Sequence, residues 1–156
     1  MGNFDSMETI LNFAIDQEKQ AYKFYKDMAS RIDNQQLSLV FEDFAAEEKS
    51  HEQKLLEIKK DVQLLPQTAQ VTDLKISDYS INVTEEDVLR DSKNYVQKAY
   101  LLAMKKEKAA FKMYSDLAQR SDNENIRKIL LSLAQEEARH KLKLEIDYED
   151  HFFTEN

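Results

Sequence analysis

The chain has 156 residues, a length that normally forms one domain (residues 1–156) with a hydrophobic core of its own. One glycine, one proline and no run of strand-like alternation predict an all-α protein. The net charge of -8 argues against nucleic acid or an anionic membrane as a partner, and the lack of cysteine excludes disulfides and thiolate metal sites. With no signal sequence and no apolar run of membrane-spanning length, we expect a cytoplasmic protein.

The first predicted helix runs from about residue 6 to residue 32, with Asp5 as its N-cap and Glu8 completing a capping box. Its apolar positions recur every three or four residues, the pattern of a helix packed in a bundle. They are Met7, Leu11, Ala14, Ala21, Tyr25, Met28 and Ile32. Glu18 interrupts this apolar stripe in the middle of the helix.

Asp33 and Asn34 form the next predicted turn, and a second helix continues to about residue 61. Its apolar stripe contains Glu48 and His51, which share one side of the helix because they lie three positions apart. The neighbouring Glu47 points about 100° away from that side, which predicts a solvated or interhelical role.

Residues 62–92 interrupt the helical pattern, with Pro66 near their start. The segment is polar with scattered apolar residues, and a cap-like Thr84 predicts a short helix at 84–91. Its length would let the chain cross from one end of a bundle to the other. A linker between two domains is the alternative, but each half alone would then expose the apolar face of a helical hairpin.

The third predicted helix, residues 94–120, carries Glu107 on its apolar stripe. Ser121 to Glu124 reads as a turn with a capping box, and the fourth helix then carries Glu137 and His140. The tail from residue 148 has no clear period. We expect His151, which lies in this tail, at the surface or packed against the end of the bundle.

The two halves of the chain are related by an internal repeat, because residues 14–55 align without a gap on residues 103–144. Four carboxylates inside one core would repel each other and lose hydration, and two divalent cations would remove both penalties. The predicted ligands are Glu18, Glu48, His51, Glu107, Glu137 and His140. A polar core that only fixes the helix register is the alternative. Carboxylates and imidazoles without thiolates favour iron or manganese, with zinc or cobalt as substitutes.

The chain resembles the rubrerythrin branch of the ferritin-like di-iron carboxylate superfamily over about residues 5–150. The resemblance rests on the two Glu-x-x-His pairs and on the glutamate in the helix before each pair. It implies a four-helix bundle with a long crossover between the second and third helices, two iron ions (Fe2+/Fe3+) and a homodimer. The given sequence has no cysteine, so we expect a relative without the cysteine-ligated rubredoxin domain of rubrerythrins. Ala110 stands where rubrerythrins carry a further glutamate, which argues against an efficient peroxidase of that type.

In such a site Glu48 and Glu137 would bridge the two metals, and Glu18 and Glu107 would each bind one. Each histidine would bind one metal as well. Two tyrosines, Tyr25 and Tyr114, lie seven residues after Glu18 and Glu107. Their hydroxyls could hydrogen-bond the ligand carboxylates, although they could equally be aromatic residues of the core.

The expected function is a non-haem di-iron oxidoreductase that reduces peroxide or dioxygen with electrons from a separate donor, such as a rubredoxin-like protein. A ferroxidase or iron-binding protein is the alternative. An O2-dependent hydroxylase is less favoured, because the apolar stripes are densely filled with Phe, Tyr and Leu and leave little room for an organic substrate.

Overall fold

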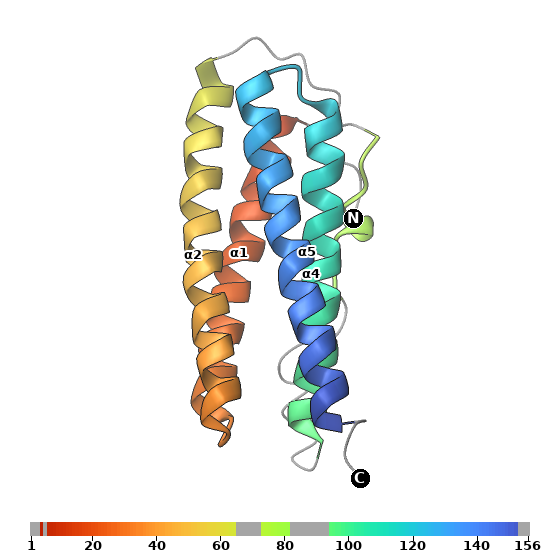
Figure 1. The fold of residues 1–156 in the computed structure, drawn as a ribbon. Coiled ribbons are helices and arrows are strands. Elements are labelled where there is room, and N and C mark those ends of the chain that lie inside the picture. The colour runs from red at the N-terminus through yellow and green to blue at the C-terminus, as the bar shows by residue number, and fades with distance from the viewer. Residues whose placement is uncertain (1–3, 5, 65–72, 82–93, 153–156) are drawn as a thin grey trace.

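The computed structural model describes residue 4 and residues 6–64, 73–81 and 94–152. Two antiparallel helical hairpins pack into a four-helix bundle (Figure 1). The first hairpin is α1 (Met7–Arg31) with α2 (Gln35–Leu64), and the second is α4 (Tyr95–Arg120) with α5 (Glu124–Phe152). A short 3-10 turn, η1 (Ile76–Asp78), follows the first hairpin and precedes the second in the sequence. The predicted all-α bundle is confirmed.

The connection between the hairpins crosses the length of the bundle, because α2 ends and α4 begins at opposite ends of it (Figure 1). The helix α2 continues to Leu64, beyond the predicted end near residue 61. Leu64 is the last described residue before Pro66, and the residue that precedes a proline disfavours helical backbone. The short helix predicted at 84–91 lies outside the described residues.

The cap of α1 differs from the prediction. Ser6 is the N-cap, because its hydroxyl accepts a hydrogen bond from the backbone N–H of Thr9 at 3.2 Å. The Thr9 hydroxyl accepts one from the N–H of Ser6 at 3.0 Å, which closes a capping box without Glu8. The predicted cap Asp5 is one residue too early and lies outside the described residues.

The cap of α5 also differs from the prediction. The side chain of Asn123, and not that of Ser121, accepts a hydrogen bond from the N–H of Ile126, at 3.0 Å. Asn34 has the same role at the start of α2, where it accepts from Leu37 at 3.2 Å. Both asparagines occupy the same place in the repeat, and amide oxygens are among the strongest helix caps.

The helix α5 extends through the tail as far as Phe152. Tyr148 and Phe152 are one turn apart, with ring centroids separated by 4.9 Å, and both pack against the core at this end of the bundle. Their contact explains why the helix continues into the tail. Two apolar residues are too few to show a helical period in the sequence, so the sequence did not predict this extension. His151 is exposed, as expected.

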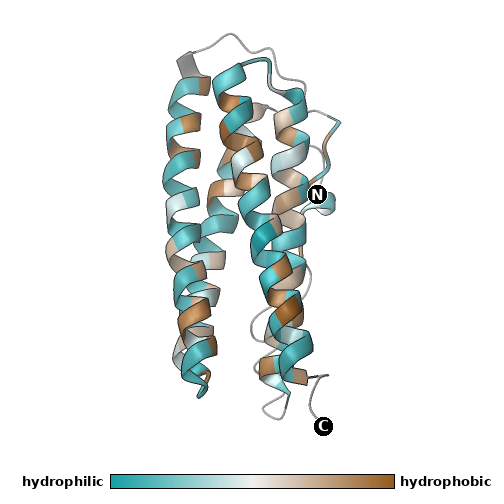
Figure 2. Ribbon diagram, viewed as in Figure 1, coloured by the Kyte–Doolittle hydropathy of each residue, from teal (hydrophilic) through white to brown (hydrophobic). Residues whose placement is uncertain are grey.

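The hydrophobic core consists of two separate clusters of buried residues, one toward each end of the bundle. Figure 2 shows hydrophilic and hydrophobic residues alternating along each helix. One cluster joins the first half of α1 to the second half of α2, and the other joins the second half of α1 to the first half of α2. The repeated glutamates and histidines lie between them. None of the described helices has the length and apolar character needed to cross a membrane.

Candidate metal centre

The structure brings all six predicted ligands together at the middle of the bundle, with at least one from each helix. Every one of these side chains is at most 2% exposed. They are Glu18 from α1, Glu48 and His51 from α2, Glu107 from α4, and Glu137 and His140 from α5. Burial of so many ionisable groups without a counter-ion is costly, so the cluster has the composition of a metal centre.

The six residues form two overlapping groups of four. In each group one ligand atom per residue can be chosen so that all four atoms lie within 4.8 Å of one another. One group contains Glu18 and His51, the other contains Glu107 and His140, and both contain Glu48 and Glu137. The two carboxylates common to both groups are those that would bridge two neighbouring metals, in agreement with what the resemblance implies.

The two histidines present the same ring nitrogen to the carboxylates. Nδ1 of His51 lies 3.1 Å from Glu18, 3.2 Å from Glu48 and 3.0 Å from Glu137. Nδ1 of His140 lies between 3.5 and 3.7 Å from Glu48, Glu107 and Glu137. The rings are nearly parallel, with centroids 6.1 Å apart. Nδ1 is therefore the atom that would bind metal in each half.

The outer nitrogen of each histidine faces a glutamate from the other half of the repeat. Glu47 lies 3.1 Å from Nε2 of His140, and Glu136 lies 3.4 Å from Nε2 of His51. Arg139 in turn lies 2.9 Å from the second oxygen of Glu47. Of the two roles expected for Glu47, the interhelical one is observed, and Glu136 makes the equivalent contact. Sequence reasoning did not identify their histidine partners, because the contact depends on how α2 and α5 are placed side by side.

The two tyrosines also act across the repeat. The hydroxyl of Tyr25 donates a hydrogen bond to Glu107 at 2.5 Å, from α1 to α4. Burial, followed by the charge of Glu107, raises the pKa of Tyr25 well above its ordinary value. Tyr114 is equally buried, and burial and the charge of Glu18 raise its pKa too. Its hydroxyl faces Glu18 in turn, but forms no well-formed hydrogen bond among the described residues.

Burial dominates the electrostatics of the carboxylates. It raises the pKa of Glu48 to about 8, with the charges of Glu18 and Glu107 adding to the rise and attraction to His51 opposing it. Burial and the charges of Glu107 and Glu48 hold the pKa of Glu137 well above its ordinary value. Burial also raises the pKa of Glu18, against the attraction of His51.

Burial affects the histidines differently from the carboxylates, because it lowers the pKa of an imidazole. Contacts with Glu18 and Glu48 outweigh burial at His51 and raise its pKa to about 10. Contacts with Glu107 and Glu48 do the same at His140, whose pKa is raised to about 9. At neutral pH protons therefore neutralise part of the charge in the metal-free centre.

The donor set fits a pair of divalent cations. Each of the six residues has at least one buried side-chain nitrogen or oxygen without a hydrogen-bond partner among the described residues. Buried polar atoms are normally satisfied, so a cluster of exceptions needs a missing partner. Two cations in place of the protons would engage these atoms and cancel the four carboxylate charges. With oxygen and imidazole donors alone, iron and manganese fit well, and zinc is a substitute.

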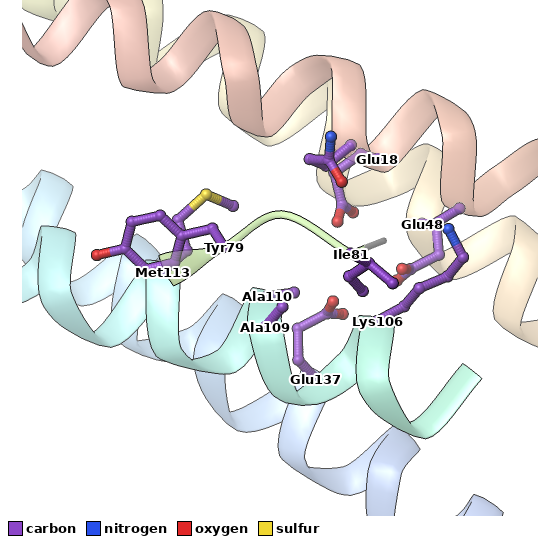
Figure 3. Close-up of a pocket in the computed structure, with 11 residues that line it drawn as sticks. Glu18, Glu48, Tyr79, Ile81, Lys106, Ala109, Ala110, Met113 and Glu137 are labelled. Atoms are coloured by element: carbon purple, nitrogen blue, oxygen red, sulfur yellow. The ribbon is translucent and has the colours of Figure 1, made fainter. Parts of the chain in front are cut away.

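A pocket between α1 and α4 borders three of the carboxylates (Figure 3). Glu18, Glu48 and Glu137 line it, and neither histidine does. Alanines form much of its α1 and α4 walls, and the connecting segment contributes Tyr79 and Ile81. The centre thus meets a pocket on its carboxylate side, where the carboxylates themselves are at most 2% exposed.

The pocket follows the internal symmetry of the chain. Three pairs of repeat-related residues line it: Gln17 with Lys106, Ala21 with Ala110, and Glu48 with Glu137. It therefore lies on the pseudo-two-fold axis and is directed at the two shared carboxylates. Sequence reasoning missed this pocket, because Tyr79 and Ile81 belong to an irregular segment with no counterpart in the repeat.

Comparison with known proteins agrees with this geometry. The chain is similar in structure to a hypothetical protein from Pyrococcus furiosus, with 25% identity, a TM-score of 0.70, and coverage of 93% of this chain and 89% of that one. It also shares its fold with a protein from Thermotoga maritima described as a ferritin-like diiron-carboxylate protein. That match has 19% identity and a TM-score of 0.75, and covers 96% of this chain and 98% of the other. None of the curated proteins is significantly similar to the chain.

The family model described as Rubrerythrin matches residues 9–146, which include all six predicted ligands and both tyrosines. The ferritin-like fold expected from the sequence is confirmed. With its buried carboxylate and histidine cluster, the chain belongs to the rubrerythrin family of ferritin-like di-iron carboxylate proteins.

Proposed function

We propose that the protein is a di-iron oxidoreductase that reduces hydrogen peroxide or dioxygen with electrons from a separate donor. The observation that carries the proposal is the pocket on the pseudo-two-fold axis, which leads directly to Glu48 and Glu137. Those are the two carboxylates common to both ligand groups. A small oxidant that arrives along this axis would reach both metal positions at once.

The residues around such a centre would have different roles. Glu48 and Glu137 would hold both irons, and each remaining glutamate and histidine would hold one. Bound iron would supply two electrons to a single oxidant from two adjacent ions. Tyr25 would fix the position of Glu107 through its hydroxyl. Glu47 and Glu136 would orient the imidazoles by contacting Nε2, which leaves Nδ1 free for metal.

The walls of the pocket favour a small oxidant over an organic substrate. Ala21, Ala109 and Ala110 are short, while Met113 and Tyr79 are large and buried and fill the space beyond them. The remaining interior is packed with aromatic and aliphatic side chains. We therefore rank hydroxylation of an organic molecule below reduction of peroxide or dioxygen.

The electron donor and the assembly are part of the same proposal. A small one-electron carrier such as a rubredoxin-like protein would return electrons to the centre, and two chains would form a homodimer. Size-exclusion chromatography with light scattering tests the dimer directly, and a clean monomer would refute it.

The deciding experiment is anaerobic loading with Fe(II), followed by addition of H2O2 or O2. We expect two irons per chain and a near-ultraviolet ferric absorption that develops faster with H2O2. Oxidation by O2 alone, with release of ferric iron, would favour the ferroxidase alternative. A chain that binds no stoichiometric iron would refute the proposal.

A further inference from the structure

The two halves of the core differ in their aromatic content. The cluster toward the C-terminal end of α5 contains Phe24, Tyr25, Phe41, Phe44 and Tyr100, with Tyr148 and Phe152 packed against it. The cluster at the other end is mainly aliphatic. The two halves of the chain are repeats with the same helical backbone. The difference in aromatic content therefore lies in the side chains alone.

The aromatic residues form a continuous series of ring contacts from the metal centre to the end of α5. The ring of Tyr25 lies 5.7 Å from that of Phe41, and Phe41 lies 5.3 Å from Tyr100. Tyr100 then contacts Tyr148 at 6.4 Å and Phe152 at 6.2 Å. Tyr25 and Tyr100 are fully buried, whereas Tyr148 and Phe152 are partly exposed.

The repeat-related tyrosine has no such series. Tyr114 occupies the position of Tyr25 in the second half, but its core cluster has Leu130 and Leu133 where the first half has Phe41 and Phe44. Leu11 stands in the position that corresponds to Tyr100. Within the described part of the chain, Tyr114 contacts no other aromatic ring. Leucine therefore suffices to pack this position, and packing alone does not require the aromatic series.

A polar group lies near the hydroxyl of each tyrosine in the series. Tyr25 already donates to Glu107. The pKa of Tyr100 is raised by burial and then by the charge of Asp147, and both the Tyr100 hydroxyl and one Asp147 oxygen lack a hydrogen-bond partner among the described residues. The hydroxyl of Tyr148 accepts a hydrogen bond from Gln97 at 2.8 Å.

We propose that Tyr25, Tyr100 and Tyr148 form a one-electron route between the metal centre and the surface at the C-terminal end of α5. The inference rests on the proposed di-iron function, because the oxidised centre supplies the driving force. The ring of Phe41 bridges the first two tyrosines and stays unchanged. An external one-electron donor would deliver electrons at the Tyr148 end.

Electrons and protons balance at every step. Tyr25 gives one electron to the oxidised centre and its hydroxyl proton to Glu107. Tyr100 then gives one electron to Tyr25, which takes its proton back, while the Tyr100 proton moves to Asp147. Tyr148 then gives one electron to Tyr100, which takes its proton back from Asp147, and the partly exposed Tyr148 gives its own proton to solvent water. The external donor restores Tyr148 with one electron, and a proton returns from solvent. No bond between heavy atoms forms or breaks.

The route is tested by trapping the oxidised tyrosine at its surface end. The Fe(II)-loaded protein is treated with H2O2 and a nitroso spin trap, without a reductant, and the adduct is located by proteolysis and mass spectrometry. Freeze-quench electron paramagnetic resonance of the same reaction follows the tyrosyl signal. We expect the adduct on Tyr148, and we expect Tyr100→Phe to lower its yield on the order of tenfold.

Two further variants separate the route from general packing. Phe41→Leu introduces the residue that the second half of the repeat already uses, and it should also lower the adduct on Tyr148. Tyr22→Phe, a matched tyrosine on α1 outside the ring series, should leave it unchanged. Tyr100→Phe should fold normally, because the lost hydroxyl has no hydrogen-bond partner among the described residues.

The outcomes distinguish this route from the proposed function. Iron content and ferric absorption are measured in the same samples, and a chain that neither binds nor oxidises iron refutes both proposals. Normal iron oxidation without an adduct on Tyr148 refutes the route alone. Equal labelling of Tyr148 in the Tyr100→Phe variant would refute it too, as would equal labelling of the partly exposed Tyr22 and Tyr95, which would indicate diffusing radicals.

Discussion

Glu47 in the first half of the chain lies 3.1 Å from Nε2 of His140 in the second half. A carboxylate on the outer nitrogen of a metal-binding imidazole fixes the tautomer and the orientation of the ring. The contact therefore couples a residue outside the ligand set to the geometry of the ligand set. Glu136 and His51 repeat the arrangement at a longer distance.

Glu47→Ala should weaken metal binding by about 10–100-fold, because the imidazole of His140 loses the group that orients it. Glu47→Gln should have a smaller effect, since its amide oxygen can still face Nε2. Chelator-competition titration with Mn(II) or Zn(II) measures both. Glu57→Gln, on the exposed face of α2, is the control. Wild-type affinity in Glu47→Ala would show that the contact has no role.

His140→Ala should leave one tightly bound metal per chain, because His140 belongs to only one of the two ligand groups. Glu48→Ala should abolish tight binding of the second metal and weaken the first, since Glu48 belongs to both groups. Helix content by circular dichroism should stay largely intact. His151→Ala, an exposed histidine, should still bind two metals. If both ligand variants bound two metals tightly, the assignment would be wrong.

The metal-free protein should lose stability as the pH rises from about 6.5 to 9. Folding raises the pKa of Glu48 to about 8, of His140 to about 9 and of His51 to about 10. The folded state then binds more protons than the unfolded state throughout this range, so the stabilisation present at low pH is lost. Each extra bound proton contributes up to about 1.4 kcal/mol per pH unit.

Thermal unfolding across that pH range measures the effect as a falling Tm. Glu48→Gln removes one of the titrating groups and should flatten the slope below pH 8. A Tm that rises over this range in the metal-free protein would contradict the assigned charge states. Metal loading should release protons, which a weakly buffered titration with a pH indicator detects.

Tyr25→Phe should destabilise the metal-free protein by about 1–3 kcal/mol, because the buried Glu107 loses its hydrogen-bond donor. Tyr114→Phe should cost less, since the Tyr114 hydroxyl faces Glu18 without a well-formed hydrogen bond. Urea denaturation of the two variants gives the comparison. Equal losses would mean that the repeat-related hydroxyls act alike.

Ala110→Leu should slow iron oxidation by H2O2 while two irons still bind, because the larger side chain narrows the pocket that leads to Glu48 and Glu137. Overpacking should cost about 1–3 kcal/mol of stability. Stopped-flow absorption measures the rate, and Ala138→Leu on the exposed face of α5 is the matched control. An unchanged rate would show that the oxidant takes another path.

The sequence alone predicts the bundle and the meeting of the six ligands, because both follow from periodicity along single helices. Glu48 and His51 face inward for the same reason as Phe44 and Leu55 do. Helix ends were less predictable. Ser6 and Asp5 are both good caps, and only the position of the chain against its neighbours decides between them.

Contacts between side chains of different helices could not be predicted from the periodicity of one helix. Glu47 was placed off the apolar stripe, which is correct, but its contact with His140 depends on the spacing of α2 and α5. The same holds for Tyr25, whose hydroxyl reaches Glu107 on another helix and not Glu18 on its own. The pocket depends on Tyr79 and Ile81, which belong to a segment without periodicity.

The charged layer at the middle of the bundle separates the two hydrophobic clusters. Among the described residues, no buried apolar cluster spans both ends, so packing between the two ends of the molecule passes through the layer of ionisable groups. Without metal, each end is an independent unit of local unfolding, and amide hydrogens at the two ends should exchange at unrelated rates. Bound metal would join these units, so that loading the centre turns two small cooperative regions into one.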